Sequence, residues 1–455
     1  MNRRTVTPDG VIPTLERRIL VDGFHVVLDL DRSSGSRLRD ARDGKEYLDC
    51  FSFFASSPLG INHPAMMEPA FLDRLARVAV NKVSNADFYT DVYAEFVEAV
   101  DRIARPASMR YFFFIEGGAL AVENALKAAF DWKVRLNRAA GVGGERGHGV
   151  LHLEHAFHGR SGYTLSLTNT ADPRKTMYYP KFDWPRIPSP AIRFPLDDAE
   201  RARLHGAEDE ALDQARRQLE QAQGGVAAII LEPIQGEGGD RHFRTRFLRG
   251  LRELADRYEA LLIFDEIQTG VGMTGRFWAF EHHDVEPDIL VFAKKMQVGG
   301  LMAGDRIDRV PDNVFHVPSR INSTWGAHIV DMLRASRMLA VIRDEGLVER
   351  AEITGRRLLT GLAESAARHG GSIDNVRGRG LMCAIDLPGT ELRDRAVRTA
   401  MTNGVIVLPC GERSIRFRPA LTISEHEIDE AVARLDDTLA AVLVDARAEI
   451  TPSGR

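Results

Sequence analysis

The chain has 455 residues, of which 44% are hydrophobic and 27% are charged, and its formal net charge is -5. This composition is typical of a globular protein with two or three domains and a sizeable buried core, and it argues against a disordered chain. Because the sequence has no excess of basic residues and no apolar stretch of bilayer length, it predicts a protein that binds neither nucleic acid nor membranes.

Cysteine usage indicates the compartment. Cys50, Cys383 and Cys410 are odd in number, widely spaced and without a CxxC pair. This pattern argues against a disulfide framework and against a structural zinc site, so no metal is expected. The first ten residues are polar and do not resemble a signal peptide. The sequence therefore predicts a cytoplasmic protein.

The N-terminal part predicts an arm, a hairpin and a loop of uncertain type. Residues 1 to about 35 hold short apolar segments between turn residues, as in an N-terminal arm. Asp43-Gly44 lies between residues 37–39 and 46–48 and predicts a β-hairpin. Residues 51–60 mix aromatic and hydroxyl side chains. Two interpretations fit them: a core strand followed by a turn, or a loop that lines a substrate site.

From about residue 109, apolar strands alternate with amphipathic helices. The first unit is a strand over residues 110–115, a glycine turn, and a helix with apolar residues at helical spacing from Ala121 to Trp132. Such alternation implies a parallel sheet that helices cover on both faces. Further strands are expected over residues 150–155, 226–231, 261–264 and 289–293, with a helix over 244–260.

The strand over residues 289–293 delivers Lys294 and Lys295 to a turn that ends in Gly299-Gly300. Desolvation at the end of a buried strand disfavours the ammonium form, so a lysine there is a candidate amine nucleophile that can form a Schiff base. The alternative is that one or both lysines point to solvent.

The C-terminal part predicts a smaller α+β domain. A long helical run begins near residue 327 and continues to about residue 369, where Gly370-Gly371 ends it. Strands are expected over residues 381–385, 405–408 and 414–417, with a final helix over 424–444.

Candidate chemical groups follow the predicted strands, where open α/β sheets bind ligands. Gly117, Gly118 and Ala119 open a helix whose free N–H groups favour a phosphate, although a tight turn is the commoner reason for a glycine pair. Asp265 ends an apolar strand and needs a cation or several donors to stay charged; a structural salt bridge is the alternative. A phosphate anchor, an aspartate and a strand-end lysine are together what pyridoxal phosphate requires.

Five motifs in order make the chain resemble the class III aminotransferases over nearly its whole length. Within that family it is most similar to the bacterial L-lysine 6-aminotransferases, while 4-aminobutyrate aminotransferases share the double lysine and residues 182–185. The family motifs are Glu116-Gly117-Gly118-Ala119, Phe157-His158-Gly159-Arg160, residues 265–270, Phe292-Ala293-Lys294-Lys295 and Arg416-Phe417-Arg418-Pro419, and the narrower likeness lies in residues 182–185, 235–243 and 322–326.

The resemblance implies an α/β, fold-type-I pyridoxal-phosphate-dependent transferase. It implies a large domain with a mostly parallel seven-stranded sheet and a smaller α+β domain. The expected division is an N-terminal arm and part of the small domain over residues 1–70, the cofactor-binding domain over 71–325 and the C-terminal small domain over 326–455. A homodimer with shared active sites is also implied.

Roles for the cofactor site follow from the same resemblance. Lys294 would form the Schiff base and transfer the proton; its spacing from Asp288 favours it, whereas counting back from Gly299 favours Lys295. His158 is interpreted as structural. The cofactor contacts implied are Asp265 at the pyridine nitrogen, Gln268 at the phenolic oxygen and the substrate, Phe157 on the ring, Gly118 and Ala119 at the phosphate, and Ser323 and Thr324 at the phosphate of the neighbouring subunit.

Two arginines are expected to bind substrate carboxylates. The guanidinium groups of Arg160 and Arg416 match carboxylate geometry, which suits the two carboxylates of 2-oxoglutarate. Glu237 resembles a switch residue that pairs with Arg416 while the donor is bound and swings aside for the acceptor. A permanent Glu237–Arg416 salt bridge is the alternative.

The resemblance thus implies transfer of the ε-amino group of L-lysine to 2-oxoglutarate, giving 2-aminoadipate 6-semialdehyde and L-glutamate. Another ω-amino donor, 4-aminobutyrate or ornithine, is the alternative. A cofactor-binding protein without turnover is a rival of a different class. A racemase or decarboxylase fits less well, because neither needs a second carboxylate-binding group.

Overall fold

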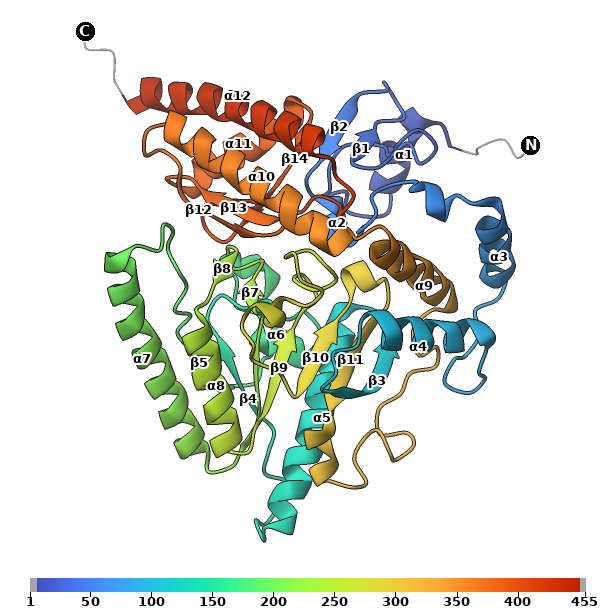
Figure 1. Cartoon of the computed structure of the whole chain (residues 1–455), viewed down its shortest axis with the longest axis vertical. Helices are drawn as coiled ribbons and strands as arrows, with labels where there is room; N and C mark the ends of the chain where they lie inside the picture. The colour runs from blue at the N-terminus through green and yellow to red at the C-terminus, as the bar shows by residue number, and fades with distance from the viewer. Residues whose placement is uncertain (1–5, 451–455) are drawn as a thin grey trace.

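The computed structural model describes residues 6–450, with side chains described up to residue 444. The large sheet and its helices form the lower part of Figure 1, and the three- and four-stranded sheets form the upper part with α10 (Leu347–Arg368), α11 (Thr390–Thr402) and α12 (Glu425–Ile450). No helix within the described residues is long and apolar enough to cross a membrane.

The large sheet has seven strands and is mostly parallel, as predicted. One strand, β11, runs antiparallel to both of its neighbours. It contains Gly299 and Gly300, so the prediction that these glycines end a turn was wrong: they begin a buried strand. The strand order is β3 (Met109–Ile115), β11 (Gly299–Gly304), β10 (Ile289–Phe292), β9 (Leu261–Asp265), β6 (Val226–Leu231), β4 (Gly149–Leu153) and β5 (Arg186–Ile187).

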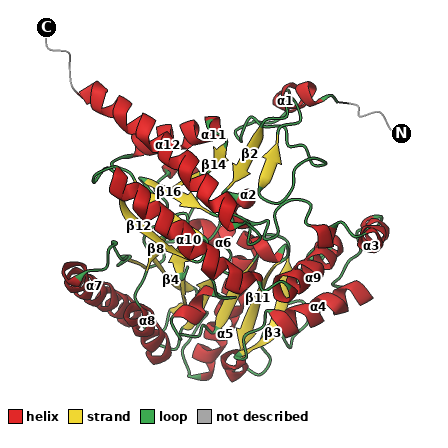
Figure 2. Ribbon diagram, turned by 45° about the horizontal axis from the view of Figure 1, so that its top comes forward, coloured by secondary structure: helices red, strands yellow, loops and turns green. Residues whose placement is uncertain are grey.

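Helices cover both faces of this sheet, which confirms the prediction from the alternating pattern. Successive residues of a strand point to opposite faces. Ile263 of β9 belongs to the same buried cluster as α5 (Gly118–Ala139), whereas Phe264 belongs to the buried cluster that includes α8 (Thr245–Arg257) and α7 (Asp198–Ala222). In Figure 2, α7 and α8 lie together at the lower left, apart from α5 at the lower centre.

One of the three smaller sheets joins the N-terminal and C-terminal parts of the chain. The predicted hairpin is present as β1 (Arg37–Arg39) and β2 (Glu46–Asp49), and β2 also pairs in parallel with β14 (Val405–Ile406). The predicted strand over residues 405–408 is therefore divided, since β15 (Leu408–Cys410) belongs to another sheet. That sheet has the order β12 (Asp374–Arg379), β13 (Met382–Asp386), β16 (Ser414–Phe417) and β15 (Leu408–Cys410), and a short pair is formed by β7 (Ile234–Gln235) and β8 (Arg241–His242).

The long C-terminal helical run is two helices rather than the one predicted. Gly346 separates α9 (Ile329–Asp344) from α10 (Leu347–Arg368), because it adopts a left-handed conformation with φ of 59°. The end at Gly370-Gly371 is confirmed. The remaining helices are α1 (Pro8–Glu16), α2 (Ser52–Ala55), α3 (Pro69–Ala79), α4 (Asp91–Ile103), α6 (Gly162–Leu167), α11 (Thr390–Thr402) and α12 (Glu425–Ile450).

Residues 51–60 form no strand, so the core-strand interpretation was wrong. All four residues of α2 have positive φ, between 40° and 61°, which makes α2 a single left-handed turn. The alternative interpretation agrees better with the structure, because Ser56 lines the cavity described next.

Candidate active site

A cavity of about 540 Å³ lies at the edge of the large sheet where the parallel strands end. The parallel strands converge on this edge and bring together residues that are far apart in the sequence. Seven of the predicted site residues line it: Gly118, Ala119, Phe157, Arg160, Asp265, Gln268 and Lys294.

The start of helix α5 forms one wall of the cavity. Gly117 precedes the helix with φ of 86°, a conformation that glycine adopts readily. The first backbone N–H groups of the helix have no partner within the helix and can bind an anion. Gly118 also packs tightly, since a Cβ atom there would lie 2.9 Å from Cδ1 of Ile267. This wall suits a phosphate group.

Asp265 lies at the end of β9 and is 3% exposed. Its Oδ2 atom is 2.8 Å from Nδ1 of His158, and its Oδ1 atom accepts a hydrogen bond from the backbone N–H of Ile267 at 3.1 Å. His158 also lines the cavity. The histidine interpreted as structural therefore orients the predicted pyridine-binding carboxylate.

The two consecutive lysines point in different directions. Lys294 lines the cavity, whereas Nζ of Lys295 donates to the backbone oxygen of Gln268 at 2.6 Å. The tight turn after β10 separates them, because Lys294 has φ of 44° and Gln297 has φ of 62°. Burial, with a smaller contribution from the charge of Arg416, lowers the pKa of Lys294 to about 7. Lys294 is thus the lysine with an amine available in the cavity.

Glu232 is a cavity residue that sequence reasoning missed. It directly follows β6, as Asp265 ends β9, so the same pattern of a carboxylate after a buried strand could have found it. Its two oxygens accept hydrogen bonds from the backbone N–H groups of Phe157 and Gly236, at 3.0 and 2.9 Å. Burial raises the pKa of Glu232 to about 7.

The predicted carboxylate-binding residues occupy two places. Arg160 lies in the cavity wall. Arg416 and Glu237 are not among the lining residues, but Arg416 lies close enough to lower the pKa of Lys294. Nη2 of Arg416 lies 2.8 Å from Oε2 of Glu237, and Lys175, which was not predicted, contacts the other oxygen of Glu237.

Ser323 and Thr324 lie outside the cavity of this chain. The side chain of Ser323 accepts a hydrogen bond from the backbone N–H of Gly326 at 3.0 Å, and the backbone oxygen of Thr324 accepts one from the Ser84 hydroxyl at 2.6 Å. The structure therefore does not bring these two residues to the other predicted site residues.

The amino-acid sequence matches the family described as Aminotransferase class-III over residues 21–439. The chain belongs to this family. A relative from Mycobacterium tuberculosis, described as L-lysine-epsilon aminotransferase, is 54% identical over 440 residues, which cover 96% of this chain and 97% of the relative. The human mitochondrial 4-aminobutyrate aminotransferase is 31% identical over 446 residues, covering 92% of this chain and 86% of the relative.

A solved structure of a similar protein has the same fold. It is described as lysine aminotransferase from Mycobacterium tuberculosis in the internal aldimine form. Its TM-score to this chain is 0.94 at 54% identity, and the match covers 96% of this chain and all of the solved chain. The predicted fold class is therefore confirmed.

The cofactor of this class III aminotransferase is pyridoxal 5'-phosphate, as predicted, and the cavity fits it. The start of α5 offers N–H groups for the phosphate, and Asp265 offers a buried carboxylate for the pyridine nitrogen. Lys294 offers an amine of lowered pKa in the same cavity. These three groups meet the cofactor's three chemical requirements.

Proposed function

We propose that this class III aminotransferase transfers the ε-amino group of L-lysine to 2-oxoglutarate, giving 2-aminoadipate 6-semialdehyde and L-glutamate. The chain is 54% identical to the L-lysine-epsilon aminotransferase and 31% identical to the 4-aminobutyrate aminotransferase. This difference supports L-lysine as the amino donor. The observation that carries the proposal is the pair of Arg416 and Glu237 beside Lys294.

This pair suits a reaction whose two substrates differ in charge near the reacting carbon. Lysine enters with its ε-amino group first, so its carboxylate lies at the far end, and Glu237 neutralises Arg416. In 2-oxoglutarate a carboxylate is bonded directly to the reacting carbonyl, and Arg416 is suited to bind it. Arg160, in the cavity wall, is the second carboxylate-binding group.

The remaining roles are part of the same proposal. When bound, the cofactor supplies a carbonyl that accepts the amino group and a ring that takes up electrons from the substrate carbon. Lys294 holds the cofactor covalently and carries the proton at the amine-bearing carbon of the substrate. Asp265 would keep the pyridine nitrogen protonated, and the backbone at Gly118 and Ala119 would hold the phosphate. Phe157 would pack against the ring, and Gln268 would bond the phenolic oxygen and contact the substrate.

We also propose a homodimer, in which Ser323 and Thr324 reach the phosphate site of the partner. Their position outside the cavity of their own chain supports this role. Several large side chains are exposed on this chain, such as Tyr178 at 93% and Tyr89 at 82%. Exposed side chains of this kind suit a protein interface. Light scattering of the purified protein would test it: a monomeric mass would contradict the proposal.

The division into domains over residues 1–70, 71–325 and 326–455 remains our proposal. The seven-stranded sheet lies between residues 109 and 304, and the pairing of β2 with β14 supports assigning part of the N-terminal segment to the small domain. We further propose a cytoplasmic location. Cys50, Cys383 and Cys410 are all free and buried, as suits a reducing compartment.

A half-reaction screen tests the activity. The purified holoenzyme is mixed separately with L-lysine, L-ornithine and 4-aminobutyrate, and the loss of the cofactor's visible absorbance is followed. We expect the fastest conversion with L-lysine and none in Lys294→Ala. One methylene separates ornithine from lysine, so discrimination of about 10–200-fold is expected.

The other outcomes are equally informative. A faster reaction with ornithine or 4-aminobutyrate would overturn the donor and leave the family and cofactor in place. If no amine changes the absorbance, a cofactor-binding protein without turnover becomes the better description.

A further inference from the structure

Glu237 has two cationic partners rather than one. Its Oε2 atom pairs with Arg416 at 2.8 Å, and its Oε1 atom contacts Nζ of Lys175. Lys175 ends the short turn Pro173–Lys175, and its side chain is 27% exposed, against 3% for Arg416. Although burial opposes ionisation, these two cations hold the pKa of Glu237 below its ordinary value. The carboxylate therefore connects a surface turn to the buried arginine.

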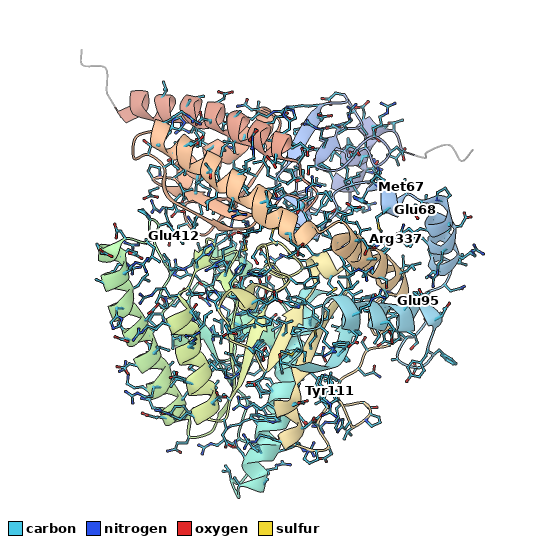
Figure 3. The ribbon with its side chains drawn as sticks, viewed as in Figure 1. Met67, Glu68, Glu95, Tyr111, Arg337 and Glu412 are labelled. Atoms are coloured by element: carbon cyan, nitrogen blue, oxygen red, sulfur yellow. The ribbon has the colours of Figure 1, made fainter. Side chains whose placement is uncertain are left out.

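A second cavity, of about 460 Å³, lies on the Lys175 side of Glu237. Its wall includes Asp172, Lys175, Glu237, Thr390 and Glu412. Glu412 follows β15, and Figure 3 shows it at the boundary between the upper and lower parts of the molecule. The cavity gives the Glu237 side chain space to move away from Arg416 while it stays in contact with Lys175.

Arg416 has unused hydrogen-bonding capacity. Among the described residues, its buried Nε and Nη1 atoms have no hydrogen-bond partner. An acceptor carboxylate can therefore bind the guanidinium, but two carboxylates facing one buried cation repel each other. Binding of the acceptor thus favours the release of Glu237, and the released carboxylate needs another cation.

Lys175 can bias this equilibrium because it interacts unequally with the two positions of Glu237. In the paired position the Glu237 carboxylate interacts with both Lys175 and Arg416. In the released position it no longer contacts Arg416 and interacts with Lys175. A group shifts an equilibrium only by its differential interaction with the two states. The stronger interaction of Lys175 in the released state favours the state that can bind the acceptor.

We propose that Lys175 is a positioning residue that holds Glu237 away from Arg416 and so selectively strengthens the binding of dicarboxylate acceptors. This inference rests on the proposed function, in which Arg416 binds an acceptor carboxylate. Lys175 touches neither the reacting atoms nor the cofactor in this role. It acts through Glu237 alone.

Steady-state kinetics of the holoenzyme test the proposal. We expect Lys175→Met to raise the KM for 2-oxoglutarate about 5–20-fold, the range of a modest coupling between two sites, and to change the KM for the amino donor by less than about twofold. Lys175→Arg keeps the charge and is expected to stay within about twofold of wild type for both substrates. Lys181→Met is the matched control: it removes an exposed lysine that does not line this second cavity.

Calorimetric binding of glutarate, a dicarboxylate that cannot be aminated, gives a second measurement that requires no turnover. Lys175→Met is expected to raise the Kd for glutarate by the same factor as the KM for 2-oxoglutarate. In a Glu237→Gln background the same substitution is expected to have no further effect, because the carboxylate that Lys175 holds is gone.

Three results would overturn the proposal: an equal change in both KM values, a Lys175→Arg variant that behaves like Lys175→Met, or an effect that persists in the Glu237→Gln background. Absence of glutarate binding to the wild type would overturn the acceptor site and this inference together. A preferred donor other than lysine would change the proposed function and leave the glutarate test intact.

Discussion

Nδ1 of His158 and Oδ2 of Asp265 lie 2.8 Å apart, and both side chains are buried. The contact joins the turn after β4 to the end of β9, two strands that β6 separates. A buried carboxylate with a fixed partner keeps one orientation in the cavity. His158 therefore determines where the charge of Asp265 points.

Removing this partner is expected to slow the reaction. We predict that His158→Ala lowers the rate of the half-reaction with L-lysine about 10–100-fold, since a hydrogen bond to a charged group is worth ~1.5–3 kcal/mol. His158→Asn keeps an N–H donor and is expected to retain more activity. His205→Ala, on the exposed surface of α7, is the control. Wild-type rates in both His158 variants would contradict the role.

The site of covalent attachment can be read directly. Borohydride reduction of the holoenzyme followed by peptide fragmentation is expected to place the pyridoxyl group on Lys294, and Lys295→Met is expected to keep that label. Because Lys295 donates to the backbone oxygen of Gln268, its loss removes the lysine's hydrogen bond from a partly buried acceptor and is expected to cost ~1–3 kcal/mol of unfolding free energy. A label on Lys295 would reverse the two assignments.

The lowered pKa of Lys294 predicts a pH-dependent stability of the cofactor-free protein. Between about pH 7 and its ordinary pKa of 10.5, Lys294 is protonated in the unfolded chain and neutral in the folded one. Stability therefore rises with pH in this window, by ~1.4 kcal/mol per pH unit, and Lys294→Met lacks this contribution.

Urea unfolding of both proteins at several pH values from 6 to 10 measures the difference. We expect the unfolding free energy of the wild type to rise steadily relative to that of Lys294→Met above pH 7. Below about pH 6 the difference between the two proteins is expected to stay constant. Parallel curves over the whole range would contradict a neutral Lys294 at alkaline pH.

Gly299 is predicted to be intolerant of any side chain. A Cβ atom there would lie 2.7 Å from the backbone oxygen of Gly117 and 2.9 Å from that of Ile115. Because backbone atoms cannot move aside as a flexible side chain can, we expect Gly299→Ala to cost ~1–3 kcal/mol of unfolding free energy and to weaken cofactor binding. Gly143→Ala is the matched control, since its Cβ would have no atom within 4 Å. Equal stability of the two variants would disprove the packing argument.

Local sequence patterns predicted most of the large sheet and many of the residues that line the candidate site. The strand over residues 226–231 has the predicted limits, because an uninterrupted apolar run between turn residues marks a buried parallel strand. Asp265 and Lys294 could be found because each is a polar residue at or just after the end of such a strand.

Other features depend on contacts that no local pattern contains. Gly299 and Gly300 resemble turn residues, but they belong to strand β11. They are glycines because the neighbouring backbone lies too close for a Cβ atom. The contact between Lys175 and Glu237 joins two loops that meet only in the folded protein. The left-handed turn at residues 52–55 likewise has no signature in glycine or asparagine.

The parallel pairing of Leu48 with Val405 has a consequence for the synthesis of this protein. During translation β14 leaves the ribosome long after β2, because the whole seven-stranded sheet lies between them in the sequence. Contacts between such distant segments form slowly, and an unpaired strand edge is prone to aggregate meanwhile. Ser56, which follows β2 and lines the candidate site, lies in a segment that is hydrogen-bonded to Arg418 and Leu421, so we expect it to become ordered only after that closure. This wall of the candidate site is therefore expected to be completed late in the synthesis of the chain.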